Sequence, residues 1–500
     1  MTINNFNSIK AFFAQKINRP IFGVGVWAFN RLGLEGIFPH YRLLCLRYSP
    51  DTALVENRVQ LLSLEKGIGA KHLNIPRNST SVLLHPQVKK CLQKFKKPLL
   101  LPYKASKKME RVCRQNDWIL GIAPTRFGKK LFENKIVFRQ VLEKLNASPP
   151  PGLVIPLKKL NYERLKKDLG LPFVLQHPTR GGGKGTFFIR RRQDFALAYE
   201  NIIKNPQAPE SEKGEKGCPK KIVAAKFIVG SSPSITVCVT RYGILNTNLQ
   251  EQILDIPELF NPHKGSGLFC GHDWTFSRQI SQKLNRQANA IAQKIGRYFQ
   301  QQGYHGIFGL DFVADQKTNQ LYTVECNPRM TGAFPTLEMA LAGSDAPPLL
   351  AFHALEYLDA EYNLDLSAVN RLLQQPKMGA HLFLHNLTEC WAYNHGVLRP
   401  GVYRLKNNQP EFLRPGYQLS DISQPEEFIV TEGVPFYKSY FSPNRRLCRV
   451  LTEDQVLYCP GQLNDWAHQV VQSVYRAFRL RPIRLVRLKK LFRPDYLAKE

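Results

Sequence analysis

The sequence predicts a multidomain protein of mixed α/β and α+β class, because its three regions differ in their pattern of apolar residues. Residues 1–126 alternate short apolar runs with polar, helix-like stretches, which is typical of an α/β layer. Residues 127–343 hold glycine-rich and acidic segments between strand-like runs, and residues 344–500 break short apolar runs with Gly and Pro before a stretch of helical periodicity. We therefore expect three domains with these bounds, the last one β-rich and ending in a helix.

Composition and charge limit the function classes. The chain has 500 residues, 43% hydrophobic and 22% charged, which excludes a wholly disordered protein. Its 70 Lys and Arg against 39 Asp and Glu give a net charge of +31, which favours phosphates, polyanions and carboxylates as ligands. Ten cysteines without a CxxC pair argue against a disulfide scaffold and a zinc site. With its longest N-terminal apolar stretch too short to cross a membrane, we expect a cytoplasmic protein without a transmembrane segment.

A glycine-rich segment lies between two predicted strands. Phe173–Gln176 and Thr186–Ile189 read as strands, and the segment 179–185 between them has the sequence TRGGGKG. Its four glycines allow the backbone N–H groups to surround an anion, and Lys184 adds positive charge. It is not a Walker loop, because Gly185 stands where Ser or Thr would be needed and a strand follows. A phosphate site and a flexible hairpin tip both remain possible from this segment alone.

An acidic hairpin is predicted further along the chain. Two strand-like runs flank a polar turn centred on Thr318, so that Asp311 lies opposite Glu325, and Asn327 shares the face of Glu325. Two carboxylates and an amide oxygen are ligands that Mg²⁺ prefers. Opposed carboxylates repel each other unless positive charge lies between them. The alternative, an acidic patch facing solvent, would have to explain why both acids interrupt strongly apolar strands.

These motifs together resemble the ATP-grasp superfamily. The resemblance rests on GGGKGT, on AKFIVGSSPSI and above all on GIFGLDFVADQKTNQLYTVECNPRMTG. It covers the central region well. It extends loosely to the first region, which would be the α/β domain that precedes ATP-grasp (the preATP-grasp domain). The last region distantly resembles the C-terminal part of biotin-carboxylase-like members. The resemblance implies a two-lobed ATP-grasp fold that holds ATP between two α+β lobes, with Mg²⁺, or Mn²⁺ in its place.

The resemblance also implies which residues bind ATP. They comprise an early phosphate-contacting lysine, the glycine loop and the hinge that pairs with adenine, namely Lys135, Gly181, Gly182, Gly183, Lys184, Gly185, Lys226, Phe227 and Ile228. Two positions depart from the family pattern. Gln176 or His177 stands where many members carry a second lysine, and Ala225 stands where a glutamate is common. The first departure puts the phosphate affinity in question.

The metal and catalytic residues follow from the same resemblance. Asp311, Glu325 and Asn327 match the metal-binding triad, in which Glu325 is expected to bridge two magnesium ions. Arg329 matches the arginine that meets the acceptor carboxylate or the acyl phosphate, and Lys184 is expected to add positive charge at the transferred phosphoryl group. Because the triad is intact, an active enzyme is expected.

The expected activity is that of an ADP-forming carboxylate–amine ligase. Such an enzyme activates a carboxylate as an acyl phosphate, which an amine then attacks, so its substrates are small-molecule or peptide carboxylates and amines. Two alternatives remain open. The first is a carboxylase-type enzyme that phosphorylates bicarbonate, which would need a separate carrier because the sequence has no Met-Lys-Met-type biotin site. The second is a non-catalytic ATP-binding regulatory protein or polyanion-binding protein.

The C-terminal segment is strongly basic. From Arg476 to Glu500 there are nine Lys or Arg and two Asp or Glu, and Leu485, Leu488 and Phe492 form a narrow apolar stripe. A solvated terminal helix is the favoured interpretation, and contact with an anionic membrane or a nucleic acid is the alternative. The sequence does not predict the oligomeric state, nor which carboxylate and nucleophile react.

Overall fold

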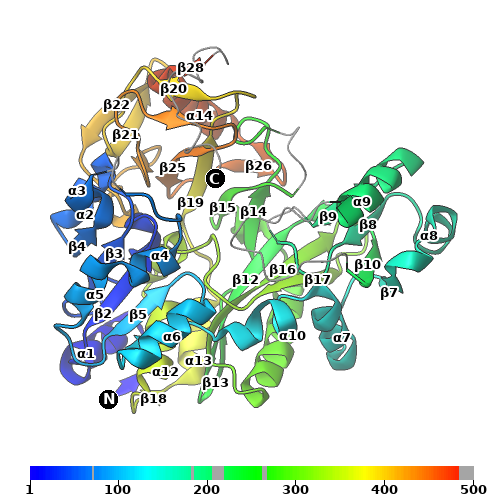
Figure 1. Cartoon of the computed structure of the whole chain (residues 1–500), viewed down its shortest axis with the longest axis horizontal. Coiled ribbons are helices and arrows are strands. Elements are labelled where there is room, and N and C mark those ends of the chain that lie inside the picture. Colours follow the sequence, from blue (N-terminus) through cyan, green and yellow to red (C-terminus); the bar gives the residue numbers. More distant parts are fainter. Residues whose placement is uncertain (70–72, 182–184, 205–218, 262–266, 484–500) are drawn as a thin grey trace.

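The computed structural model describes residues 1–69, 73–181, 185–204, 219–261 and 267–483. Figure 1 shows an α/β layer in the first quarter of the chain, a small lobe that projects to one side, and a large sheet that connects this lobe to the C-terminal part. The cleft described below lies where the small lobe meets the large sheet.

The N-terminal part is a five-stranded parallel sheet covered by helices. Its central strand β2 is buried along its whole length, as expected for a parallel sheet with helices on both faces. In spatial order the strands are β4 (Gln60–Ser63), β3 (Arg42–Cys45), β2 (Ile21–Gly25), β5 (Leu99–Pro102) and β6 (Ile119–Leu120). The helices are α1 (Phe6–Lys16), α2 (Pro50–Glu56), α3 (Leu64–Ile68), α4 (Ser79–Leu84), α5 (Pro86–Leu92) and α6 (Lys107–Gln115).

The small lobe is a four-stranded antiparallel sheet that carries the predicted glycine-rich segment. In spatial order its strands are β7 (Gly152–Pro156), β10 (Lys221–Lys226), β8 (Phe173–Gln176) and β9 (Thr186–Ile189). Strands β8 and β9 have the predicted bounds, and Gly185 directly precedes β9. Helices α8 (Tyr162–Leu169) and α9 (Arg192–Lys204) cover this sheet, and α7 (Lys135–Leu145) leads into it.

One twelve-stranded sheet runs through the rest of the molecule. In spatial order its strands are β11 (Gly230–Ser231), β16 (Gly306–Asp315), β12 (Pro233–Thr240), β14 (Gln250–Leu254), β15 (Phe269–Asp273), β19 (Ala380–His385), β25 (Arg446–Thr452), β23 (Phe428–Thr431), β21 (Gly401–Lys406) and β22 (Gln409–Arg414). Two further strands pair beside this row, β13 (Gly243–Asn246) with β12 and β17 (Leu321–Asn327) with β16.

Helices hold these layers together. The long α10 (Gln282–Gln301) packs its apolar face, including Ile291, Ile295 and Phe299, under β12 and β16. Helix α12 (Leu349–Leu358) contacts both β12 and β16 of the large sheet and β5 and β6 of the N-terminal sheet. The remaining helices are α11 (Thr336–Ala342), α13 (Leu366–Leu373) and α14 (Asp465–Phe478).

The predicted C-terminal helix is present, but it is not the last element of the described chain. Helix α14 ends at Phe478, and strand β28 (Leu480–Pro482) follows it in a three-stranded sheet with β20 (Ala392–Asn394) and β24 (Tyr440–Phe441). Arg479 at the helix end takes a left-handed conformation, which turns the chain back toward β20. The stripe predicted for residues 485–492 lies outside the described residues. Two small sheets remain, β1 (Thr2–Ile3) with β18 (Asn363–Leu364) and β26 (Leu457–Cys459) with β27 (Gln462–Leu463).

The three proposed domain bounds stay a prediction. The large sheet passes from the central region into the last region through the pairing of β15 with β19, so residue 343 does not mark the end of a sheet. All nine described cysteines are unpaired thiols. None of the helices in the described ranges combines the length and apolarity needed to cross a bilayer.

A buried acid in α11 predicts a pH-dependent stability. Glu338 is fully buried, its Oε2 accepts a hydrogen bond from the Leu350 N–H at 3.2 Å, and its Oε1 has no partner among the described residues. Burial raises the pKa of Glu338 from 4.5 to about 8. The stabilising protonated form is thus fully present below the unfolded pKa and is lost as the pH rises through the folded pKa.

We expect the melting temperature to fall between about pH 4.5 and about pH 8, and Glu338→Gln to reduce that fall by several degrees. The amide keeps the acceptor for Leu350 but carries no charge at high pH. Thermal unfolding across this range measures the effect, with the exposed Glu389→Gln as control. Equal slopes for Glu338→Gln and the wild type would contradict the prediction.

Candidate active site

The acidic hairpin consists of β16 and β17, which pair antiparallel around the turn at residues 316–320. Asp311 lies opposite Glu325, and Asn327 lies opposite Gly309. A bulge follows Asp311 on the side of the turn and leaves this pairing in the register predicted from the sequence. Asn327 Nδ2 donates a hydrogen bond to Asp311 Oδ2 at 2.8 Å. The structure thus brings the three side chains together, whereas their role as metal ligands stays a prediction.

The surroundings of Asp311 disfavour the charged form of its carboxyl group. Burial, and secondarily the negative charge of Glu325, raise the pKa of Asp311 from 3.8 to about 7. Gln252 Nε2, on strand β14, which is separated from β16 by β12, donates to Asp311 Oδ1 at 3.3 Å. Removing two facing carboxylates from water is costly unless a cation compensates their charge. The site therefore favours a positive ion between its two acids.

Lys135 joins the acidic hairpin to the glycine-rich segment. It is the first residue of α7, and its side chain is 5% exposed. Its Nζ lies 3.4 Å from Glu325 Oε2 and donates to the carbonyl oxygen of Arg180 at 3.1 Å. A cation held at this place can neutralise a phosphate group that lies between the two segments. The predicted early lysine thus lies beside the predicted metal site.

Arg329 follows the hairpin and is held by a dense set of contacts. Its Nη2 donates to Asn327 Oδ1 at 2.6 Å, and its Nη1 donates to the Met330 carbonyl oxygen at 2.9 Å. Its Nη1 also donates to the Tyr103 hydroxyl, and the guanidinium carbon lies 4.9 Å from the centre of the Tyr103 ring. These contacts fix the planar fork of Arg329 at the mouth of the hairpin, as a carboxylate-binding arginine requires.

Two residues of this site were not predicted from the sequence. Tyr103 follows β5 of the N-terminal sheet, and Glu133 precedes α7. Glu133 Oε2 lies 2.6 Å from Lys104 Nζ, and its Oε1 lies 3.5 Å from Arg329 Nε. The only signal for Tyr103 was its place after a predicted parallel strand, since ligands gather at the carboxyl ends of such strands. Glu133 carried no comparable signal.

The two strands that flank the glycine-rich segment are paired up to its ends. Gln176 pairs with Thr186 across β8 and β9, and the His177 N–H donates to the Gly185 carbonyl oxygen at 2.7 Å. Gln176 lines the cleft, whereas His177 is buried and accepts a hydrogen bond from the Thr179 N–H at 3.2 Å. Burial, followed by the charge of Arg180, lowers the pKa of His177 to about 4, so it is neutral. Of the two candidates for the second lysine position, Gln176 is the one on the cleft wall.

Three of the predicted loop residues, Gly182, Gly183 and Lys184, lie outside the described residues. Gly181 and Gly185, at the two ends of the loop, are described.

A cleft of about 580 Å³ connects these elements. At one end its wall is apolar and includes Val174, Phe188, Phe227 and Ile228, with the rings of Phe188 and Phe227 edge to face at 5.5 Å. Such a wall suits a flat heterocycle. The predicted site residues that line the cleft are Gln176, Lys226, Phe227, Ile228, Asp311, Glu325, Asn327 and Arg329. Among the described residues, Lys135, Gly181 and Gly185 are predicted site residues outside this lining.

The donor set fits Mg²⁺ better than a softer metal. Within the described ranges, no three His, Cys, Asp or Glu side chains gather as metal ligands, and the predicted triad has two carboxylates and one amide. Asn327 turns its amide nitrogen toward Asp311 and its oxygen toward Arg329. A half-turn of this amide would place its oxygen beside the two carboxylates, which gives the all-oxygen set that Mg²⁺ prefers.

Comparison with known proteins supports the ATP-grasp resemblance of the central region. A sequence model of the ATP-grasp domain matches residues 132–333. The chain carries an ATP-grasp domain. The matched segment contains the small lobe, the glycine-rich segment, the acidic hairpin and Arg329, and it confirms the predicted resemblance.

The curated relative that this chain matches is distant. A ligase from Niallia circulans, [butirosin acyl-carrier protein]–L-glutamate ligase, is 22% identical over 281 residues, which cover 54% of this chain and 62% of that protein. The match thus spans less than two thirds of the relative's length.

Two solved structures show the same fold over nearly the whole chain. The biotin carboxylase domain of Hydrogenobacter thermophilus 2-oxoglutarate carboxylase has a TM-score of 0.55 at 14% identity and covers 96% of this chain and 95% of its own. The N5-carboxyaminoimidazole synthase of Aspergillus clavatus has a TM-score of 0.51 at 12% identity and covers 92% of this chain and 98% of its own. The predicted ATP-grasp fold is confirmed at this level.

The closed glycine segment leads to a matched pair of variants. A Cβ at Gly185 would lie 2.6 Å from Arg180 Cβ and 2.8 Å from the Arg180 carbonyl oxygen, whereas a Cβ at Gly181 would meet nothing within 4 Å. Gly185→Ala should therefore cost about 1–3 kcal/mol of unfolding free energy, since the backbone must shift. Gly181→Ala should leave stability almost unchanged. Denaturant unfolding of both variants measures this, and equal losses would show that the close approach at Gly185 does not exist.

Proposed function

We propose that the protein is an ATP- and Mg²⁺-dependent, ADP-forming ligase that activates a carboxylate as an acyl phosphate and joins it to an amine. The observation that carries this proposal is the meeting of Asp311 and Glu325 across β16 and β17, with Lys135 reaching from them to the glycine-rich segment. The name of the Niallia circulans relative, a carrier-protein–glutamate ligase, supports the same class of bond formation.

Different parts of the cleft would bind the adenine and the triphosphate of ATP. Adenine would lie against Phe188, Phe227 and Ile228, at the apolar end of the cleft. The triphosphate would extend toward Lys135, which lies between the glycine-rich segment and Glu325. Gln176 offers a neutral amide to the phosphates where many family members offer a lysine, so we expect Lys135 to carry more of the phosphate charge in this protein. Gly182, Gly183 and Lys184 are proposed to cover the triphosphate.

Phosphoryl transfer needs charge compensation and positioning more than a protein nucleophile. Magnesium bound by Asp311, Glu325 and a turned Asn327 would supply positive charge to the phosphoryl group. Arg329 holds the acceptor carboxylate through its planar fork, and Tyr103 and Glu133 keep this fork in place. A pre-positioned acceptor lowers the entropic part of the barrier.

Two alternatives to this function, a carboxylase and a regulatory protein, are tested in one phosphate-release assay. Because the similarity in fold to a biotin carboxylase domain extends over 96% of the chain, bicarbonate is included as a candidate acceptor. Purified protein with Mg²⁺ and ATP is screened for phosphate release against pooled carboxylates and amines, with mass spectrometry of the products. Bicarbonate-dependent release would favour a carboxylase, and ATP binding without release in any pool would favour a regulatory protein. A cytoplasmic location is part of the proposal and agrees with the unpaired thiols.

Glu325→Gln should abolish carboxylate-dependent ADP release, because the amide cannot supply the second negative ligand beside Asp311. The exposed Glu389→Gln is the matched control. Coupled ADP detection measures the rates, and melting curves establish that both variants fold. Wild-type turnover in Glu325→Gln would refute the metal assignment.

Arg329→Lys should raise KM for the carboxylate about tenfold, because lysine keeps the charge but loses the fork. KM for ATP should change little. Arg164→Lys on the exposed surface of α8 is the control. Steady-state kinetics with each substrate varied measure the two constants, and a raised KM for ATP alone would assign Arg329 to the nucleotide instead.

A further inference from the structure

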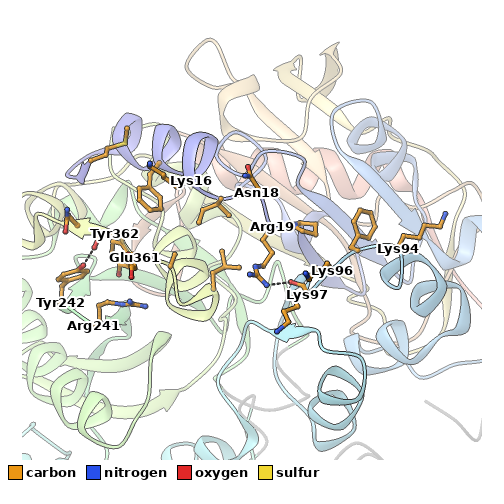
Figure 2. A pocket seen from close by; sticks show the side chains of 18 residues that line it. Lys16, Asn18, Arg19, Lys94, Lys96, Lys97, Arg241, Tyr242, Glu361 and Tyr362 are labelled. Carbon is orange, nitrogen blue, oxygen red and sulfur yellow. Dashed lines mark hydrogen bonds between the residues drawn. The ribbon is translucent and has the colours of Figure 1, made fainter.

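A second and larger pocket lies away from the cleft. It has a volume of about 1150 Å³ and shares no lining residue with the cleft. Its wall comes from four places in the chain: the end of α1 with the following turn, residues 94–97 before β5, the β12–β13 turn at residues 241–242, and residues 358–363 before β18 (Figure 2). The pocket therefore lies at the junction of the N-terminal layer and the central sheet.

The wall of this pocket is strongly basic. Its cationic side chains are Lys16, Arg19, Lys94, Lys96, Lys97 and Arg241, and its one acidic side chain is Glu361.

Only part of this positive charge is compensated by the protein. Arg241 pairs with Glu356 at 3.4 Å and with Asp359 at 3.0 Å, and Lys97 pairs with Asp117 at 3.3 Å. For Lys16, Lys94 and Lys96 the described residues provide no acidic partner within 4.0 Å. Arg19 donates to the Lys97 carbonyl oxygen at 3.3 Å and also has no acidic partner among them.

Like charges gathered in a concave surface repel one another and concentrate anions from solution. The arrangement of these side chains is typical of a site that receives a multiply charged anion, because a single negative charge would leave most of the cations uncompensated. Arg241 and Lys97 are already paired with acidic side chains, so the uncompensated charge is that of Lys16, Arg19, Lys94 and Lys96.

The floor of the pocket is aromatic. Phe12 and Tyr362 are both 4% exposed and pack with their ring centres 6.4 Å apart. Tyr242 lies edge to face on Tyr362 at 5.1 Å, and Phe95 adds a further ring. Aromatic faces beside cations accommodate a flat organic group that carries negative charge.

We propose that this pocket binds an organic polyphosphate, a small molecule with at least two phosphate groups and one flat apolar group. Phosphates would contact Lys16, Lys94 and Lys96, and the flat group would lie on the ring of Tyr242, which is 43% exposed. The pocket has a volume of about 1150 Å³, which is enough for a small organic molecule. This site is separate from the ATP cleft and does not depend on the proposed ligase activity.

Titration calorimetry with adenosine 3′,5′-bisphosphate tests the proposal. Excess non-hydrolysable ATP analogue and Mg²⁺ are present, so that the cleft is filled. The proteins are the wild type, Lys94→Glu/Lys96→Glu, and the control Lys107→Glu/Lys108→Glu, which reverses two exposed charges at the start of α6 outside the pocket. Melting curves verify that all three fold.

We expect binding to the wild type and the control, weakened about tenfold or more in Lys94→Glu/Lys96→Glu and weakened by added salt. Adenosine and inorganic pyrophosphate should each bind more weakly than the bisphosphate. Equal affinity in all three proteins, or no binding at millimolar concentration, would overturn the proposal. If adenosine bound as tightly as the bisphosphate, the proposed phosphate contacts would be wrong. If inorganic pyrophosphate bound as tightly as the bisphosphate, the proposed aromatic contact would be wrong.

Discussion

The opposition of two carboxylates across one β-hairpin determines how the rest of the site is built. Asp311 and Glu325 are paired by strand register, so neither can move away from the other without breaking the ladder. Their repulsion is tolerated because Lys135 lies beside Glu325 and because Gln252 and Asn327 donate to Asp311. The backbone thus enforces a local excess of negative charge that a divalent ion relieves.

The N-terminal layer takes part in this site through Tyr103 and Lys104. Tyr103 extends from the end of β5 to Arg329, where it provides both a ring face and a hydroxyl acceptor. Arg329 is thereby held from two sides, by the hairpin that carries it and by a layer more than two hundred residues earlier in the sequence. The end of the cleft at Arg329 therefore depends on the packing of α12 between the two sheets, since this helix contacts both.

The sequence predicted the local parts of the site better than the distant ones. A turn centred on Thr318 predicted Asp311 opposite Glu325. The structure has this pairing because a bulge after Asp311 shifts the register set at the turn, where Ala314 pairs with Leu321. The bounds of β8 and β9 also followed from the two apolar runs on either side of the glycine-rich segment. Tyr103 and Glu133 were missed, since their contacts with Arg329 depend on how separate layers pack. The strand after α14 was missed because the left-handed turn at Arg479 has no Gly or Asn to indicate it.

The unbroken large sheet has a consequence for any attempt to isolate the ATP-grasp domain. Strand β15 of the central region gives its outer edge to β19 of the last region, with Gly271, His272 and Asp273 paired to Leu382, His381 and Ala380. A fragment that stops near residue 343 would leave the backbone groups of β15 without their partners. Such an exposed edge recruits strands from other molecules, so the fragment would be prone to self-association even if its own cleft were intact.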